Sequence, residues 1–256
     1  MIVVLLLMIV GGIGLAQTVS DPHQVTLRWL RLGGIIAVTL LAVAAAIVLV
    51  TGANDFAAAF WVMAGLTGMG FVAQLVLVQQ AKRKAQRLAA AAGYALACLT
   101  AIEAVHGSDG QQVLAHAGVL LSIPIGVGLV GGFVMTMLLG HAYLTAEGQM
   151  TQDPFRRLVL MLAWLLGLRA VASIWLGLYP YATDPVQTAS MWHTLMITAR
   201  YLVGLVVPAV FTYMIWACVN QRANQSATGI LYVAGVLVII GEGIALGLLG
   251  TTGWML

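Results

Sequence analysis

Long apolar runs, separated by short polar segments, occupy most of this chain of 256 residues. A helix that crosses a bilayer needs about 20 mainly apolar residues, and runs of that length recur along the sequence. We place eight spans near 1–18, 29–51, 56–80, 88–105, 112–140, 156–178, 191–218 and 228–250. The sequence lacks the two-residue alternation that is typical of a membrane β-barrel. The pattern therefore predicts an all-α polytopic membrane helix bundle with a single transmembrane domain over residues 1–256.

The composition supports this class, because 62% of the residues are hydrophobic and only 7% are charged. Such a chain is not a water-soluble domain. The net charge of +3 requires no nucleic acid partner, and membrane lipids are the expected surroundings. The first apolar run has no basic residue before its core, so we interpret it as a retained span rather than a cleaved signal peptide.

Lysine and arginine concentrate in alternate connections between the spans, which therefore lie on one side of the membrane. They are Arg28, Arg31, Lys82, Arg83, Lys84, Arg87, Arg156, Arg157 and Arg222. The positive-inside rule makes this side cytoplasmic, and an even number of spans then puts both termini outside. We expect a multi-pass protein of the bacterial inner membrane. Binding of anionic lipid or of a soluble partner is the alternative role for the basic cluster at 82–87.

Local signals predict helix ends and close helix contacts. Asp-Pro pairs at 21–22, 153–154 and 184–185 are typical of helix starts, and the first predicts a short interfacial helix with Trp29 at headgroup depth. Gly128/Gly132 and Gly243/Gly247 predict tight helix packing, with room for a flat ligand as the alternative. Pro124 predicts a kink in the fifth span. We find no convincing internal repeat.

Three successive spans each contain a charge: Arg169, Arg200 and Glu242. An ionised group at the bilayer centre costs about 3 kcal/mol or more, so these groups should face one another or a wet cavity. Counting about 1.5 Å per residue places all three at one level. We expect Glu242 to pair with one or both arginines, and Glu103 to complete the cluster or to lie at the outer interface. Two interpretations of this ion pair are open: it fixes the packing of the helices, or it is a functional centre.

A mid-membrane cluster of this kind suits proton transfer or recognition of a polar head such as a quinone. Tyr201 is a further candidate beside the cluster. Four residues predicted near the cytoplasmic face, His141, Tyr143, Thr228 and Tyr232, combine an imidazole, phenols and a hydroxyl. We expect the segments His141–Thr145 and Ser226–Tyr232, to which they belong, to line a quinone-binding cavity beside the cluster that opens toward the cytoplasmic leaflet. Helix caps and an aromatic belt are the alternative explanation.

The remaining chemistry is sparse. His116 and His193 are the best candidates for a haem ligand pair, but no helix carries the two histidines that two stacked haems require. Motifs for a metalloprotease, a P-loop, a serine hydrolase nucleophile or an EF-hand are missing from the sequence, which argues against a hydrolase or an ATP-driven machine. Cys98 and Cys218 fall inside apolar runs and read as small core residues.

Two segments carry a resemblance: Gly140–Thr145 (GHAYLT) and Gln225–Tyr232 (QSATGILY) resemble segments of uncharacterised bacterial polytopic inner-membrane proteins. In its number of spans the chain is also similar to eight-helix membrane subunits of the polysulfide-reductase (NrfD-like) type, which handle quinones beside iron–sulfur partners. These observations predict a membrane subunit of a larger electron-transfer complex that handles a quinone or protons. The alternatives are a secondary transporter of a small anion or metabolite, and a structural membrane anchor.

Overall fold

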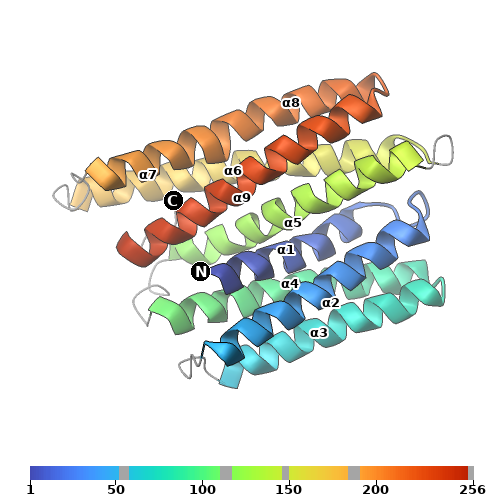
Figure 1. Cartoon of the computed structure of the whole chain (residues 1–256), viewed down its shortest axis with the longest axis horizontal. Coiled ribbons are helices and arrows are strands. Elements are labelled where there is room, and N and C mark those ends of the chain that lie inside the picture. The colour runs from blue at the N-terminus through green and yellow to red at the C-terminus, as the bar shows by residue number, and fades with distance from the viewer. Residues whose placement is uncertain (52–57, 110–116, 146–149, 184–190, 253–256) are drawn as a thin grey trace.

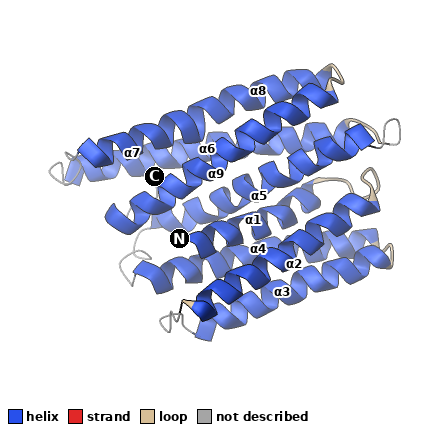
Figure 2. Cartoon of the chain, in the orientation of Figure 1, coloured by secondary structure: helices blue, strands red, loops and turns tan. Residues whose placement is uncertain are grey.

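The computed structural model describes residues 1–51, 58–109, 117–145, 150–183 and 191–252, with the backbone only at 106–109, 117–119, 177–183 and 252. Every regular element in these ranges is helical (Figure 2). They are α1 (Ile2–Val19), α2 (Leu27–Val50), α3 (Ala58–Gln79), α4 (Arg83–Asp109), α5 (Ala117–Thr145), α6 (Asp153–Thr183), α7 (Met191–Tyr201), the π-helix η3 (Leu202–Val206), α8 (Val207–Asn220) and α9 (Asn224–Thr252).

Within the described ranges, eight helical segments are long and apolar enough to cross a membrane, with α7, η3 and α8 forming one of them. Each of the eight predicted spans coincides with one segment, and the differences are confined to the ends. The chain is therefore an all-α, multi-pass membrane helix bundle, as the hydrophobic pattern predicts.

The helices form two rings of four (Figure 1). In the first ring α1 packs on α2, α2 on α3, α3 on α4, and α4 on α1. In the second, α5 packs on α6, α6 on α8, α8 on α9, and α9 on α5. The neighbour order is the same in both rings, although we recognised no repeat in the sequence.

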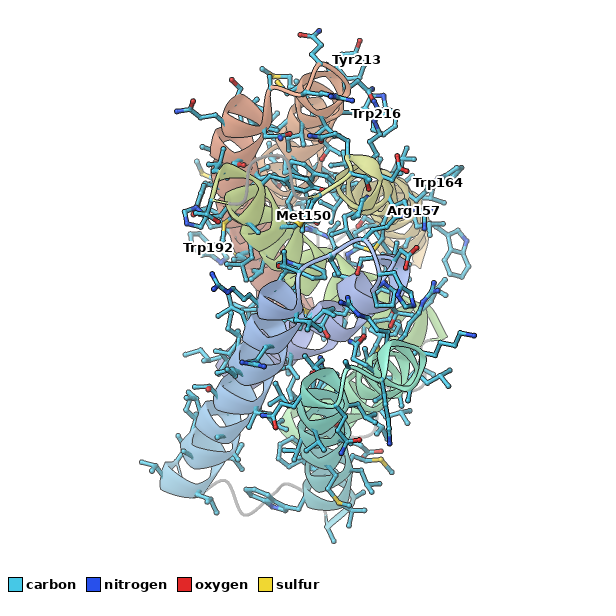
Figure 3. All side chains as sticks on the ribbon, turned by 90° about the vertical axis from the view of Figure 1, so that its right-hand side faces the viewer. Met150, Arg157, Trp164, Trp192, Tyr213 and Trp216 are labelled. Atoms are coloured by element: carbon cyan, nitrogen blue, oxygen red, sulfur yellow. The ribbon has the colours of Figure 1, made fainter. Side chains whose placement is uncertain are left out.

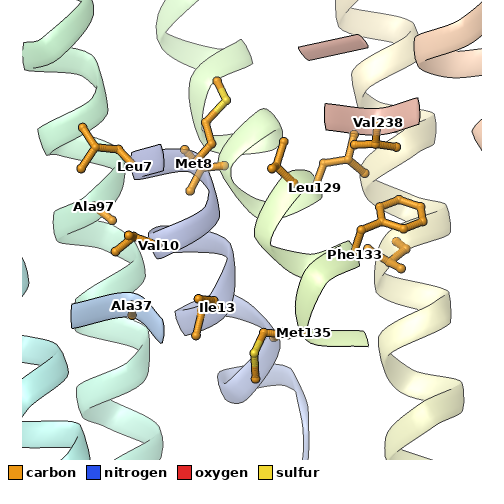
Figure 4. Close-up of a cluster of buried hydrophobic side chains, with 14 of the residues drawn as sticks. Leu7, Met8, Val10, Ile13, Ala37, Ala97, Leu129, Phe133, Met135 and Val238 are labelled. Atoms are coloured by element: carbon orange, nitrogen blue, oxygen red, sulfur yellow. The ribbon is translucent and has the colours of Figure 1, made fainter. Parts of the chain in front are cut away.

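The rings meet where α1 crosses α5, and glycine makes this crossing possible. A Cβ atom added to Gly131 would lie 2.6 Å from the Cα atom of Gly12, so the two backbones touch. Met8 and Leu129 lie beside the crossing, and the buried side chains around it continue into both rings (Figure 4). Small residues permit this approach where helices pack without water. The pair that makes it is Gly12/Gly131, whereas Gly128 and Gly132 face leucine and methionine side chains.

The basic connections lie at one end of the bundle, which we call the inner end. There α1, α3, α5 and α8 end and α2, α4, α6 and α9 begin, on the right in Figure 1 and facing the viewer in Figure 3. Arg87 donates from Nε to the carbonyl of Thr18 at 2.7 Å, and thus stabilises the C-terminal end of α1. We retain the cytoplasmic side as the predicted location of the inner end.

Two local predictions have different outcomes. Asp153 begins α6, as the Asp-Pro pair at this position predicts, whereas 184–185 lie outside the described residues. The interfacial helix with Trp29 at headgroup depth is wrong. Thr26 caps α2 by accepting from the backbone N–H of Trp29, whose buried indole donates to the carbonyl of Met135 at 3.2 Å. A partner for the indole N–H inside the protein explains why this tryptophan leaves the interface.

Pro124 lies inside α5, which continues on both sides of it. The hydroxyl of Tyr94 on α4 donates to the Pro124 carbonyl at 3.1 Å. This hydrogen bond links the two rings beside the residue at which we predicted a kink.

Candidate functional site

Glu242 binds both arginines at the centre of the second ring. The Arg169 guanidinium donates from Nε to Oε1 at 3.0 Å and from Nη2 to Oε2 at 2.9 Å, which is a bidentate pair. Arg200 donates from Nη2 to Oε1 at 2.8 Å. All three side chains are fully buried. The predicted pairing is confirmed, and it involves both arginines; we call these residues the Arg–Glu–Arg cluster.

The cluster joins three consecutive membrane segments at one depth. Measured from the inner end of each helical segment at about 1.5 Å per residue, Arg169 lies at about 24 Å, Glu242 at about 27 Å and Arg200 at about 30 Å. These values differ by about one helical turn, so a single carboxylate can reach both guanidinium groups. Ion pairs with this geometry hold α6, α7 and α9 in one relative register.

Glycines make room for the Arg200 guanidinium. A Cβ atom on Gly204 would lie 2.9 Å from Nη1 of Arg200 and 2.8 Å from the Cα atom of Gly241. The η3 and α9 backbones therefore touch directly beside the charge. The sequence analysis predicted close packing at Gly243/Gly247, but a Cβ on Gly243 would meet nothing within 4 Å, and one on Gly247 would meet only the Met196 side chain. Gly241 is the residue that makes the contact.

A π-helical turn follows Arg200 immediately. The N–H of Val207 donates to the carbonyl of Leu202, five residues earlier, and Pro208 follows at the start of α8. Proline lacks an N–H and clashes with the carbonyl four residues earlier, so a wider turn at this point accommodates it. Such turns occur frequently at functional sites.

The carboxylate also contacts the first helix of its ring. A Cβ atom on Gly126 of α5 would lie 3.0 Å from Oε2 of Glu242 and 3.3 Å from the methyl carbon of Met8. Met8 belongs to α1, so the cluster lies beside the α1–α5 crossing. With the Gly126 backbone and the Met8 methyl group beside it, the buried carboxylate is solvated by the two guanidinium groups. Electrostatic interactions are strong in such surroundings.

Of the residues predicted to lie near the cluster, Tyr201 does so, whereas Glu103 and Tyr232 do not. Tyr201 lies next to Arg200 in the chain, and its hydroxyl donates to the Ser173 carbonyl on α6 at 2.8 Å. Glu103 takes part in neither ion pair and lies half-buried on α4, in the other ring. Tyr232 is exposed on α9, about 15 Å from Glu242 along the helix. Equal depth did not bring Glu103 to the cluster because its helix packs against α1 and α3.

An apolar groove of about 490 Å³ opens between α6 and α8 on the lipid-facing side of the second ring. Its wall includes Leu166, Gly167, Ala170, Leu205, Thr212 and Trp216. Ala170 follows Arg169 in the chain, and Leu205 follows Gly204, against which the Arg200 guanidinium packs. The buried residues of its lining are Val159, Leu166, Leu205 and Thr212. Trp216 and Tyr213 project from α8 at the edge of the bundle (Figure 3).

A second, polar pocket of about 770 Å³ lies at the inner end, between the end of α5, the start of α6 and the α8–α9 turn. Tyr143 and Ser226 line it, as expected for a cavity at this face. Its predicted position beside the cluster is wrong, because Ser226 precedes Glu242 by 16 residues on α9, or about 24 Å.

The other residues predicted to line this cavity lie elsewhere. Thr228 is buried, donates to the Asn224 carbonyl at 2.7 Å and packs against Gly140, whereas His141 and Tyr232 are exposed. The Tyr143 ring stacks on Phe155 with the ring centroids 5.3 Å apart. Of the four residues predicted to bind a quinone there, Tyr143 is therefore the one that lines the pocket.

Comparison of the chain with protein-family models, curated proteins and solved structures finds no match. The roles of these residues therefore rest on their geometry and chemistry.

His193 is half-buried on α7, and His116 lies outside the described residues, so the haem ligand pair stays a prediction. Within the described ranges no group of three or more His, Cys, Asp or Glu side chains is arranged to hold a metal ion. Cys98 and Cys218 are both free thiols, as their apolar surroundings in the sequence indicate.

The sequence analysis missed a cluster of glutamines in the first ring. Gln17 and Gln74 both donate from Nε2 to the carbonyl of Leu30, at 2.9 Å and 3.3 Å, and Gln86 donates to Oε1 of Gln17 at 3.5 Å. The three side chains are buried and, with Leu30, come from all four helices of the ring. A glutamine within an apolar run was the available signal, because a buried amide requires partners.

Proposed function

We propose that this chain is the membrane subunit of a bacterial electron-transfer complex, in which the Arg–Glu–Arg cluster handles a quinone or the protons that a quinone exchanges. The chain is almost entirely membrane helix, so the electrons would come from a partner subunit. This proposal keeps the function expected from the sequence and moves the quinone site. The new location is the groove between α6 and α8.

The observation that carries the proposal is the position of the groove relative to the charges. A groove of about 490 Å³ lined by aliphatic and aromatic side chains suits the isoprenoid tail of a quinone that diffuses in from the lipid. Its wall includes Ala170, which follows Arg169 on α6, and Leu205 of η3, the π-helical turn that comes after the Arg200-bearing end of α7. A lipophilic molecule would come this close to a mid-membrane ion cluster mainly by moving sideways from the lipid into the groove.

The cluster supplies the polar half of such a site. A bound quinone supplies redox chemistry in which electrons and protons are taken up together. Guanidinium N–H groups donate hydrogen bonds to an oxygen that gains negative charge, and Glu242 can hold a proton next to them. Because Arg169 and Arg200 both bind this carboxylate, any movement of one arginine toward a ligand changes the proton affinity of Glu242.

Access from the groove to the cluster requires a local movement at Leu205. This side chain lies in the π-helical turn, directly after Gly204. A π-turn holds one residue more than an α-turn, so migration of this turn along the helix would rotate the residues it passes, Leu205 included, and leave the helix beyond it in place. We therefore assign the opening to η3.

The test is to fill the groove without disturbing the protein. Gly167 lines the groove and has no atom within 4 Å of an added Cβ, so the side chain of Gly167→Leu starts in open space and adds bulk to the groove. Gly65→Leu is the matched control, because Gly65 is equally open but lies on α3. The chain is purified in native-lipid nanodiscs, and bound quinone is quantified by extraction and mass spectrometry, with photoreactive quinone as a second probe. We expect Gly167→Leu to lose most of the bound quinone and the label on α6 and α8, and Gly65→Leu to retain both.

Equal quinone content in the two variants, or a wild-type protein that carries none, would refute the proposal. A structural anchor would then account for the cluster, since a fully buried ion triad can serve only to fix three helices.

A second candidate function, secondary transport of a small anion or metabolite, is supported by the shared neighbour order of the two rings. Parallel repeats of this kind occur in transporters, with the substrate bound where the repeats meet. The α1–α5 crossing is that meeting place, and the cluster lies beside it. Proteoliposomes with an imposed proton gradient should then take up the anionic substrate, and Arg200→Gln should abolish the uptake. Uptake by wild type together with an unchanged Gly167→Leu variant would favour this function over the first.

A further inference from the structure

The polar pocket at the inner end has the chemistry of an anion site, and it is separate from the proposed quinone site. It occupies about 770 Å³ between Tyr143 at the end of α5, the start of α6 and the α8–α9 turn. Its distance of about 24 Å from Glu242 along α9 excludes direct contact with the Arg–Glu–Arg cluster. Met150 lies over the middle of this end of the second ring in Figure 3 and also lines the pocket.

Two arginines from different elements line this pocket. Arg156 is half-buried in the first turn of α6, and Arg222 occupies the turn between α8 and α9. One carboxylate, the exposed Asp153, also lines it, so the described charges leave one positive charge in excess. The helices α6 and α9 both begin here, which adds the positive ends of two helix dipoles. The pocket therefore favours an anion.

Polar atoms in the wall show which kind of anion fits. Nε of Arg156, Oε1 of Gln152 and Oδ1 of Asn224 are buried and make no hydrogen bond with the described residues. The first is a donor and the other two are acceptors. A buried polar atom without a partner costs about 1–3 kcal/mol, so a ligand toward which these three lining side chains turn, and which then satisfies all three atoms, is favoured. Such a ligand offers anionic oxygens to the arginine and hydroxyl groups to the amide oxygens.

The positive-inside distribution of lysine and arginine does not by itself explain why Arg156 and Arg222 line this pocket. Arg157 is next to Arg156 in the chain and contributes equally to the charge of the inner end. It is exposed and lies outside the pocket, on the side of α6 that also carries Trp164 (Figure 3). The positive-inside rule requires only exposed charges such as that of Arg157. Arg156 instead points a partly buried guanidinium group into a defined cavity.

We propose that the pocket binds a phosphate ester that carries free hydroxyl groups, with Arg156 and Arg222 holding the phosphate. Guanidinium groups bind phosphate oxygens in a bidentate manner, and the oxygens of Gln152 and Asn224 accept from the hydroxyls. Two sources share this chemistry. One is the headgroup of a glycerol-bearing anionic phospholipid in the adjacent leaflet, and the other is a water-soluble phosphate ester such as glycerol 3-phosphate.

The experiment separates the sources by using one probe for each. The whole chain is reconstituted in phosphatidylcholine nanodiscs. In the first arm phosphatidylglycerol is added and retained lipid is counted by native mass spectrometry. In the second arm glycerol 3-phosphate is titrated by calorimetry, with inorganic phosphate as the hydroxyl-free comparison. We expect saturable binding of a single molecule in one of the two arms.

Three variants decide whether the pocket is responsible. Arg156→Gln and Arg222→Gln should each weaken binding by about tenfold or more, because each removes a charge-assisted contact to phosphate. Arg157→Gln should leave the affinity within about twofold, since it removes an equal charge from a neighbouring exposed position. Arg222 is exposed in a turn, so its substitution keeps the test valid if Arg156→Gln proves unstable.

Failure of both probes to bind in a saturable way would overturn the proposal. An equal loss in Arg157→Gln would do so as well, because it would show a general effect of surface charge. Inorganic phosphate that binds as tightly as glycerol 3-phosphate would disprove the role assigned to the hydroxyl groups. None of these outcomes depends on quinone content, so they leave the proposed function untouched.

Discussion

The two rings share one neighbour order but differ in what lies at their centres. In the first ring Gln17 and Gln74 both donate to the Leu30 carbonyl and Gln86 donates to Gln17, whereas the second ring contains a carboxylate held by two arginines. In both, a side chain from one helix is bound by groups from other helices of the ring. The same arrangement of helices therefore accepts a neutral or an ionic centre.

The two centres differ in how strongly they hold the helices of their ring together. A neutral hydrogen bond contributes about 0.5–1.5 kcal/mol, and an amide left unpaired costs about 1–3 kcal/mol. A buried ion without its partner costs about 3–5 kcal/mol. The glutamine centre can thus lose a member with moderate loss of stability, whereas the Arg–Glu–Arg cluster must remain complete. The order of the following predictions reflects this contrast.

Glu242→Gln should have the largest effect, because it leaves two buried guanidinium groups without their carboxylate. We expect the free energy of unfolding, measured by SDS titration in mixed micelles, to fall by about 3–5 kcal/mol. The triple variant Arg169→Met/Glu242→Leu/Arg200→Met removes every charge and should be more stable than the single variant. A triple variant that is less stable than Glu242→Gln would show that the three residues do not act as one unit.

Gly241→Ala should come next, at about 1–3 kcal/mol, because the new methyl group meets the backbone of Gly204 and displaces the Arg200 guanidinium. Thermal unfolding in detergent measures the loss. Gly243→Ala is the control: it adds the same group in open space two residues away and should be neutral or slightly stabilising. Similar losses in both variants would mean that helix propensity, rather than the contact with η3, determines the result.

Gln17→Leu tests the neutral centre. It removes the hydrogen bond to Leu30 and the oxygen that accepts from Gln86, and should cost about 1–2 kcal/mol in the same assay. Gln74→Leu should cost less than about 1 kcal/mol, because the Leu30 carbonyl keeps Gln17 as a donor. If either substitution were as destabilising as Glu242→Gln, the contrast between the two rings would be lost.

Tyr94→Phe should have the smallest effect. It deletes the hydrogen bond from α4 to the Pro124 carbonyl, at 3.1 Å, and leaves the aromatic group of the side chain packed between the two halves of the bundle. The expected loss is about 0.5–1.5 kcal/mol. Tyr232→Phe removes a hydroxyl from an exposed side chain and should leave the unfolding free energy unchanged. Equal stability of the two variants would show that this link between the rings contributes nothing.

The charged residues show how far the candidate site could be predicted. Their depth along each span correctly indicated that Glu242 meets at least one of the arginines, since depth follows from counting residues in a helix; the structure shows that it binds both. The same count gave Glu103 a place at that level, and the structure puts it in the other ring. Depth is one coordinate of three. The other two depend on which helices are neighbours and on how each is rotated, and a residue count contains neither.

By itself the sequence determined the number of spans, their limits to within a few residues, the side that carries the basic connections and the depth of each charge. All of these are local properties, because hydropathy and charge act on each segment through the surrounding lipid and water. The tertiary structure decided which helices form each ring and where they cross, at Gly12/Gly131 and Gly204/Gly241. It also decided which side chains donate to the Leu30 carbonyl and where the Trp29 indole lies. These depend on side chains far apart in the chain that fit together, and inside a membrane such fit selects the neighbours of each helix, since burial from water no longer does.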